Sequence, residues 1–165
     1  MVREMKISGL TMDPHTNTPI VVLKDTNSDT SVPIWIGLLE ATAIATELEQ
    51  VQFARPMTHD LIKNLMGHLG AKVDRVEVCD LRDNTFYAWI YLLVNGKETR
   101  IDARPSDALA IALRANARIF VSEKVIEKSG KVETVGKAEI RDKDAKKWTD
   151  ILENLSPEDF GKYKM

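Results

Sequence analysis

The chain has 165 residues, of which 44% are hydrophobic and 29% charged, and its formal net charge at pH 7 is −2. This length fits one domain that buries a core without covalent staples, and the composition is that of a globular rather than a disordered chain. The slight acidic excess argues against a dedicated, strongly basic nucleic-acid-binding module, although an enzyme can contact phosphates through a local basic groove.

The first half of the chain is predicted to form three strands and then two helices. These elements are expected at residues 2–12, 18–24, 32–36, 38–52 and 58–68. Pro56 ends the first helix, and Thr58 is the expected N-cap of the second. Gly70 suits the position that follows a helix C-terminus.

The second half shows the same order of elements. Three strands, a helix and a short strand are expected at residues 73–81, 86–94, 98–103, 105–116 and 119–121. Asn95-Gly96 predicts a tight hairpin, because both central turn positions need a positive φ. Residues 124–147 are expected to be a solvated stretch, with a further helix over 142–155.

The two halves also resemble each other in sequence. A shift of 67 positions brings them into register without a gap: Asn17-Thr18 falls on Asn84-Thr85, Ile34 on Ile101, and Glu40-Ala41 on Asp107-Ala108. We therefore predict an α+β fold in which two β-β-β-α repeats form a mixed or antiparallel sheet packed with helices. The helix over 58–68 is inserted between the repeats.

The expected organisation is one domain over residues 1–125 and a C-terminal helical extension, residues 126–165, packed on it. The single cysteine, Cys79, excludes an intrachain disulfide and fits a reducing compartment. No apolar run approaches the roughly 18 residues of a membrane span, and the N-terminus lacks the charged region followed by an apolar core that is typical of a signal peptide. These features predict a cytoplasmic chain without membrane contact.

Reactive side chains concentrate in four short stretches, residues 33–40, 55–60, 80–87 and 101–108. Carboxylates suited to hold Mg²⁺ or Mn²⁺ are Glu40, Asp60, Asp102 and Asp107. The predicted catalytic residues are His59 as base together with Asp60, Asp102 and Asp107. The predicted substrate-binding residues are Arg55, Arg104 and Ser106, with the arginines on phosphate oxygens. No motif for an organic cofactor is present.

Each of these residues also has a structural interpretation. Glu40 and Asp107 fall in the first turns of helices, where a negative charge favours the helix dipole. Asp60 can serve its own helix start, and Thr58 and Ser106 can be N-caps. Asp102, Arg55 and Arg104 can form plain salt bridges, and His59 can be an exposed first-turn residue.

The four stretches resemble the bifunctional nuclease domain family. The motifs that carry the resemblance are Pro-Ile-Trp-Ile-Gly at 33–37 with Glu40-Ala41, Arg-Pro-Met-Thr-His-Asp-Leu at 55–61, Asp-Asn-Thr-Phe-Tyr-Ala at 83–88 and Ile-Asp-Ala-Arg-Pro-Ser-Asp-Ala-Leu-Ala at 101–110. They cover roughly residues 2–125. The resemblance implies an α+β fold, a homodimer, and the nuclease activity on DNA and RNA that plant relatives have. It carries no assigned catalytic residues.

Three functions follow as hypotheses. The first is a nuclease that hydrolyses DNA or RNA with low sequence preference and divalent-metal assistance. The second is a non-catalytic oligomeric module that binds a protein, a nucleic acid or a small ligand. The third is a hydrolase for a small phosphorylated metabolite that uses the same groups in a narrow pocket.

Overall fold

The computed structural model describes residues 1–130, and the sequence predictions for 131–165, including the helix over 142–155, lie outside the described residues. The first half consists of β1 (Val2–Met12), β2 (Pro19–Asp25), β3 (Ser31–Trp35), α1 (Leu38–Leu48) and α2 (Thr58–His68). The second half consists of β4 (Ala71–Arg82), β5 (Thr85–Val94), β6 (Lys97–Ala103), α3 (Pro105–Ala115), β7 (Arg118–Ser122) and α4 (Glu123–Ser129).

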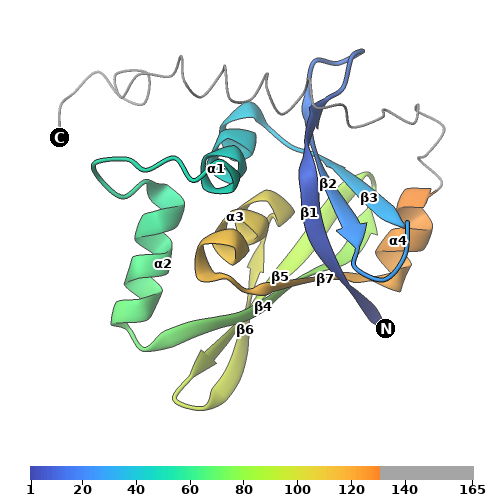
Figure 1. The fold of residues 1–165 in the computed structure, drawn as a ribbon. Coiled ribbons are helices and arrows are strands. Elements are labelled where there is room, and N and C mark those ends of the chain that lie inside the picture. The colour runs from blue at the N-terminus through green and yellow to red at the C-terminus, as the bar shows by residue number, and fades with distance from the viewer. Residues whose placement is uncertain (131–165) are drawn as a thin grey trace.

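All seven strands of the described part belong to one sheet with the order β3-β2-β1-β7-β4-β5-β6 (Figure 1). Two three-stranded antiparallel meanders, β1 to β3 and β4 to β6, flank the central strand β7. β7 runs antiparallel to β1 and parallel to β4, so the sheet is mixed. The predicted α+β class is confirmed, and three strands followed by a helix occur in each half.

Tight turns close the meanders where the sequence predicts them. Asn95 and Gly96 both have positive φ, 51° and 75°, as the hairpin between β5 and β6 requires. Asp83 and Asn84 have φ values of 48° and 60° between β4 and β5. These short polar residues tolerate the left-handed region that branched side chains avoid.

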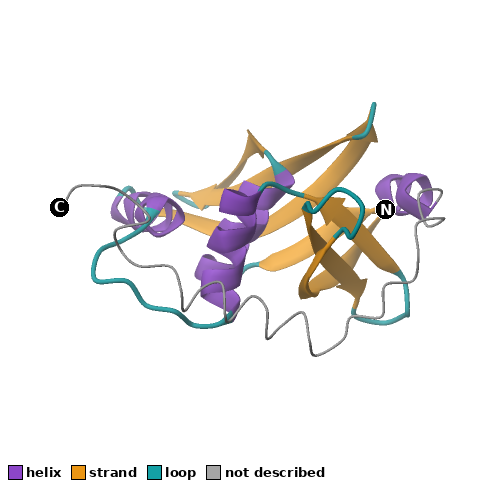
Figure 2. Ribbon diagram, turned by 90° about the horizontal axis from the view of Figure 1, so that it is seen from above, coloured by secondary structure: helices purple, strands orange, loops and turns teal. Residues whose placement is uncertain are grey.

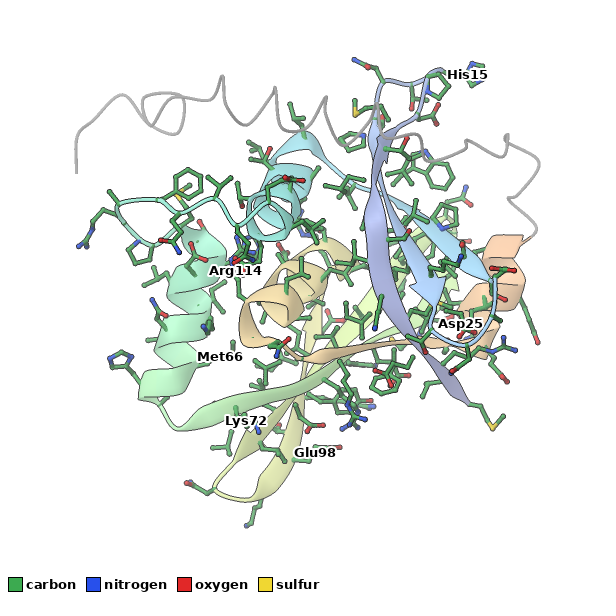
Figure 3. The ribbon with its side chains drawn as sticks, viewed as in Figure 1. His15, Asp25, Met66, Lys72, Glu98 and Arg114 are labelled. Atoms are coloured by element: carbon green, nitrogen blue, oxygen red, sulfur yellow. The ribbon has the colours of Figure 1, made fainter. Side chains whose placement is uncertain are left out.

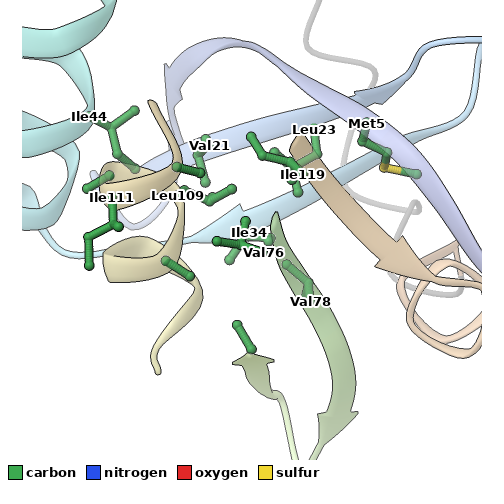
Figure 4. Close-up of a cluster of buried hydrophobic side chains, with 14 of the residues drawn as sticks. Met5, Val21, Leu23, Ile34, Ile44, Val76, Val78, Leu109, Ile111 and Ile119 are labelled. Carbon is green, nitrogen blue, oxygen red and sulfur yellow. The ribbon is translucent and has the colours of Figure 1, made fainter. Parts of the chain in front are cut away.

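One continuous hydrophobic core joins both halves (Figure 4). Alternate residues of the strands point into it, so Val76 and Val78 of β4 face Ile34 of β3, and Leu109 of α3 lies beside them. The sheet is curved, since α4 contacts both β3 and β4, which are far apart in the strand order.

The helices α1, α2 and α3 lie together, with α3 between the other two (Figures 1 and 2). α3 is the most buried of the three, because its small residues Ala108, Ala110 and Ala112 allow close approach to the sheet. By contrast, α2 has no fully buried residue and packs only through partly buried side chains such as Ile62 and Met66.

Three local predictions differ from the structure. α1 ends at Leu48, earlier than the expected residue 52, and Met57 rather than Thr58 precedes the first helical residue of α2. α4 was not predicted: residues from 124 onward were expected to be solvated, yet Val125 is fully buried. The expected domain boundary after residue 125 falls inside this helix. Within residues 1–130, no helix is long and apolar enough to span a membrane.

Candidate functional site

The first turns of three helices meet at one point of the surface. Arg104, the N-cap of α3, donates from Nε to Asp107 Oδ2 and from Nη1 to Glu40 Oε1, each at 2.8 Å. The other oxygen of Asp107, Oδ1, lies 2.9 Å from His59 Nε2. Glu40 belongs to α1, His59 to α2 and Asp107 to α3, and Arg104 is the N-cap of α3. We call these four residues the His59 cluster.

Hydrogen bonds to charged partners favour the ionised form of Asp107 in this cluster. Burial alone would raise the pKa of Asp107, but the hydrogen bonds from Arg104 and His59 outweigh it and lower that pKa below its ordinary value. Asp107 and Glu40 in turn raise the pKa of Arg104. Arg104 remains largely exposed, while the side chain of His59 is 15% exposed. The cluster therefore joins a solvent-facing cation to a half-buried acid and a sheltered imidazole.

Gly37 makes room for this arrangement at the start of α1. The carboxylate of Glu40 folds back over Gly37 so closely that a Cβ atom at position 37 would collide with it. A glycine at the end of the Pro-Ile-Trp-Ile-Gly motif therefore allows Glu40 to reach Arg104.

Beneath the His59 cluster, a second ion pair ties the three helices together. Arg114 Nε donates to Asp60 Oδ1 at 2.6 Å, and its terminal nitrogens donate to the carbonyls of Ala43 and Ala110. The side chain of Arg114 is only 5% exposed, and Figure 3 places it between α1 and α2. Asp60 also accepts from the backbone N–H of Met57. Arg114 was not among the site residues predicted from the sequence. The available signal was a single arginine near the apolar C-terminal end of the helix that is now α3.

The pKa of Asp60 has the same balance of causes as that of Asp107. Burial raises this pKa, but the hydrogen bonds from the Met57 N–H and from Arg114 together lower it by more, so the net shift is downward. Asp60 thus serves the start of α2, as its structural interpretation expected, and it also anchors Arg114, which was not predicted.

The other predicted site residues lie elsewhere. Asp102 is exposed on β6, opposite Trp89 of β5, and has no ion pair among residues 1–130. Arg55 is exposed in the segment before α2 and also has no acidic partner in that part of the chain. Ser106 is buried in the first turn of α3, whose N-cap is Arg104, so Ser106 is not the cap.

The predicted metal ligands are divided in the same way. Glu40 and Asp107 share Arg104, Asp60 pairs with Arg114, and Asp102 stands apart on β6. Among the described residues, no three His, Cys, Asp or Glu side chains are arranged to hold a metal ion.

A second acidic centre lies at the end of β4, inside the predicted reactive stretch 80–87, although Asp80 was not among the predicted site residues. Asp80 is buried and accepts from Arg82 Nε at 2.6 Å, while Lys124 Nζ lies 2.8 Å and Lys128 Nζ 3.4 Å from its Oδ1. Lys128 also donates to the carbonyl of Leu81. Both lysines belong to α4, so this centre fastens α4 to β4.

The fold and the His59 cluster define a small α+β domain with a surface histidine–aspartate–arginine site. The chain belongs to the bifunctional nuclease domain family, whose domain matches residues 21–134. An uncharacterised protein of Mycobacterium tuberculosis is 36% identical over 162 residues, which cover 95% of this chain and 97% of the relative. The predicted family is therefore confirmed.

Plant relatives are more distant and longer. Bifunctional nuclease 1 of Arabidopsis thaliana is 29% identical over 133 residues, 73% of this chain and 40% of the plant protein. Bifunctional nuclease 1 of Oryza sativa subsp. japonica is 25% identical over 114 residues, 67% of this chain and 34% of the rice protein. The similarity thus covers well under half of each plant protein.

Proposed function

We propose that this chain is a nuclease that hydrolyses DNA or RNA phosphodiester bonds with low sequence preference, with His59 as the general base. The observation that carries the proposal is the 2.9 Å contact between His59 Nε2 and Asp107 Oδ1. A carboxylate that accepts from Nε2 leaves the lone pair on Nδ1, which has no partner among the described residues and can take a proton. The names of the plant relatives support the same activity.

The reaction follows from these groups. A water molecule bonds to phosphorus as its proton passes to His59 Nδ1, the bond to the leaving oxygen breaks, and solvent protonates that oxygen. Asp107 stabilises the imidazolium that forms. Arg104, the exposed cation of the cluster, binds the phosphate oxygens and offsets the charge that develops on them.

Assistance by Mg²⁺ or Mn²⁺ remains a separate proposal. The four predicted ligands do not converge within residues 1–130, so no step above depends on a metal ion. Activity measured during titration with EDTA, and then with each cation, tests this point. Full activity in EDTA would reject the metal requirement and leave the role of His59 intact.

A pair of histidine variants tests the nuclease proposal. His59→Gln is expected to lower kcat by about 10²–10⁴-fold, the usual contribution of a general base. His68→Gln is the matched control, because His68 lies in the same helix but bonds only the Asn64 carbonyl. Equal cleavage of DNA and RNA by both variants would refute the proposal and would point to a contaminating nuclease.

The alternative function is a non-catalytic oligomeric module, and exposed leucines favour it. Leu61, Leu65 and Leu69 form an exposed stripe along α2, and Leu39 of α1 is 79% exposed. Arg104 is also already held by two carboxylates. The homodimer stays part of this proposal, and light scattering of the wild-type chain and of Leu65→Ser tests it. A monomeric wild-type chain would contradict it.

We also propose that the two halves are structural repeats. Equivalent positions at the 67-residue offset behave alike, since Asn17 and Asn84 both have positive φ, 54° and 60°, and Glu40 and Asp107 both start helices. Superposition of Val2–Leu48 on residues 69–115 in an experimental structure tests this, and poor overlap of the strands would reject it.

A further inference from the structure

One face of the sheet presents aromatic rings to solvent. In β5, Ala88 and Ile90 point into the core. The side chains of Tyr87, Trp89 and Tyr91 alternate with them and therefore lie on the opposite face. The same alternation places Phe120 of β7 on this outer face, since its neighbours Ile119 and Val121 are buried.

The strand register arranges this outer face into two neighbouring rows that cross β7, β4, β5 and β6. Residues that pair directly across strands lie on the same face of a sheet. The first row is Arg118, Arg75, Tyr91 and Arg100. The second row is Phe120, Glu77, Trp89 and Asp102. We call these eight residues the arginine–aromatic face.

Each arginine of the first row stacks on a ring. The guanidinium carbon of Arg75 lies 3.8 Å from the centre of the Tyr91 ring. That of Arg100 lies 4.4 Å from the Trp89 ring, and that of Arg118 lies 5.3 Å from the Phe120 ring. Such stacking fixes each guanidinium beside a ring of the outer face.

The charges of these arginines are not equally satisfied. Arg75 pairs with Asp74 and Glu98, so its charge is largely neutralised. Arg100 and Arg118 have no carboxylate partner within residues 1–130 and are exposed. They stand at the two ends of the first row. The face therefore offers two cations that lack a carboxylate partner in the described part of the chain, with Tyr91 between them in the row and Trp89 and Phe120 beside them.

We propose that the arginine–aromatic face binds single-stranded nucleic acid, with bases stacked on Trp89 and its neighbouring rings and phosphates on Arg100 and Arg118. Ring faces suit unpaired bases, because bases in a duplex are already stacked on each other. The inference rests on the proposed function, since it names the form of the substrate. β6 ends at Ala103, directly before Arg104 of the His59 cluster, so the second row lies close in sequence to that cluster.

Binding of a fluorescein-labelled oligothymidylate of about 12 nucleotides, followed by fluorescence anisotropy, tests the proposal. Trp89→Leu removes a stacking ring and is expected to weaken binding about 5- to 140-fold, whereas Trp89→Phe keeps a ring and most of the affinity. The double variant Arg100→Ala with Arg118→Ala is expected to reduce the slope of log K against log salt by about 1.4.

The matched control removes two charges from the other half of the sheet. Lys6 and Lys24 pair across β1 and β2, and neither stacks on a ring, so their double alanine variant should keep the wild-type affinity. Circular dichroism confirms that each variant is folded. Asp102→Asn removes an unpaired negative charge beside Trp89 and is expected to tighten binding.

The outcomes separate this proposal from the nuclease proposal. Wild-type affinity in both Trp89→Leu and the double arginine variant would overturn the binding face, even if cleavage by His59 persists. Tight binding that depends on these residues, without any cleavage, would support the face and reject the nuclease. If Trp89→Leu instead dissociates an oligomer and leaves oligothymidylate binding unchanged, the face is a contact between copies and the proposal is wrong.

Discussion

Asp80 and Asp107 both form ion pairs, and their partners differ in kind. Asp80 at the end of β4 is surrounded by Arg82, Lys124 and Lys128, and its side chain is 7% exposed. Asp107 at the start of α3 is 30% exposed and contacts Arg104 and a histidine. The hydrogen bonds from Lys124 and Arg82 hold the pKa of Asp80 far below its usual range, whereas burial is the strongest single influence on the pKa of Asp107 and the hydrogen bonds from Arg104 and His59 together outweigh it.

This difference in partners separates a structural carboxylate, Asp80, from a candidate catalytic one, Asp107. The partners of Asp80 are two lysines and an arginine, and this centre holds α4 against the sheet. A partner of Asp107 is an imidazole, a group that both accepts and releases protons in catalysis, so this contact can move a proton. A shifted carboxylate pKa alone does not mark an active site. The identity of the hydrogen-bond partner shows whether the carboxylate has a structural or a catalytic role.

The largest expected effect is the loss of kcat when Asp107 is replaced by asparagine, and Asp80→Asn is the comparison. Asp107→Asn keeps the shape but loses the charge that orients and stabilises His59, so kcat should fall about 10²–10⁴-fold. Asp80→Asn should keep the wild-type kcat at a temperature where it is folded. Cleavage of a fluorescent oligonucleotide measures both. A loss of activity in the folded Asp80→Asn variant alone would reverse the two roles.

The next largest effect is on stability at Arg114. Arg114→Ala removes one hydrogen-bond donor from Asp60 and one from each of the Ala43 and Ala110 carbonyls, so the free energy of unfolding should fall by about 2–3 kcal/mol. Arg104→Ala is the matched control, because that side chain is 64% exposed and its removal should cost little stability. Urea denaturation measures both, and an equal loss in the two variants would contradict a scaffold role for Arg114.

A smaller loss of stability is expected at the end of β4. Asp80→Asn removes the negative charge that joins α4 to β4, and the melting temperature should fall by several degrees. Asp29→Asn is the control, since Asp29 is fully exposed and, within residues 1–130, its one ion pair is with Lys24. If both variants melt like the wild-type chain, α4 is held by Val125 and its apolar neighbours instead.

The smallest expected effect is the pH dependence of that loss. The pKa of Asp80 is lower in the folded chain than in the unfolded one, where Asp titrates near about 3.9. Its contribution is therefore complete above that value and disappears as the pH falls toward the folded pKa. The melting temperatures of wild type and Asp80→Asn should differ at pH 7 and approach each other below about pH 4. A constant difference would refute this linkage.

The sequence was sufficient for most of the fold because its signals are local. Alternating apolar residues located the strands, and Asn95-Gly96 located a hairpin, since a turn type depends on the φ angles of two residues. The helix 58–68 was predicted at its observed bounds. α4 was missed, because its seven residues are mostly polar and only Val125 and Ser129 are buried.

The candidate site was predicted only in part, because local sequence signals identify reactive residues but not their neighbours in space. His59, Glu40, Arg104 and Asp107 were recognised from their residue types at element ends, and the structure brings them together. Asp102 was selected with them, yet it lies on the outer face of β6. Side-chain alternation indicated that it faces away from Ile101, but not which face of the sheet is covered.

By itself, the amino-acid sequence determined the family, the α+β class, the positions of most elements and the short list of reactive residues, because periodicity and motifs depend on near neighbours. Only the tertiary structure decided which of those residues meet. The partners of Arg114, the lysines around Asp80 and the rows of arginines and rings on the outer face come from residues far apart in the chain. Their contacts depend on strand register and helix packing, which no local pattern specifies.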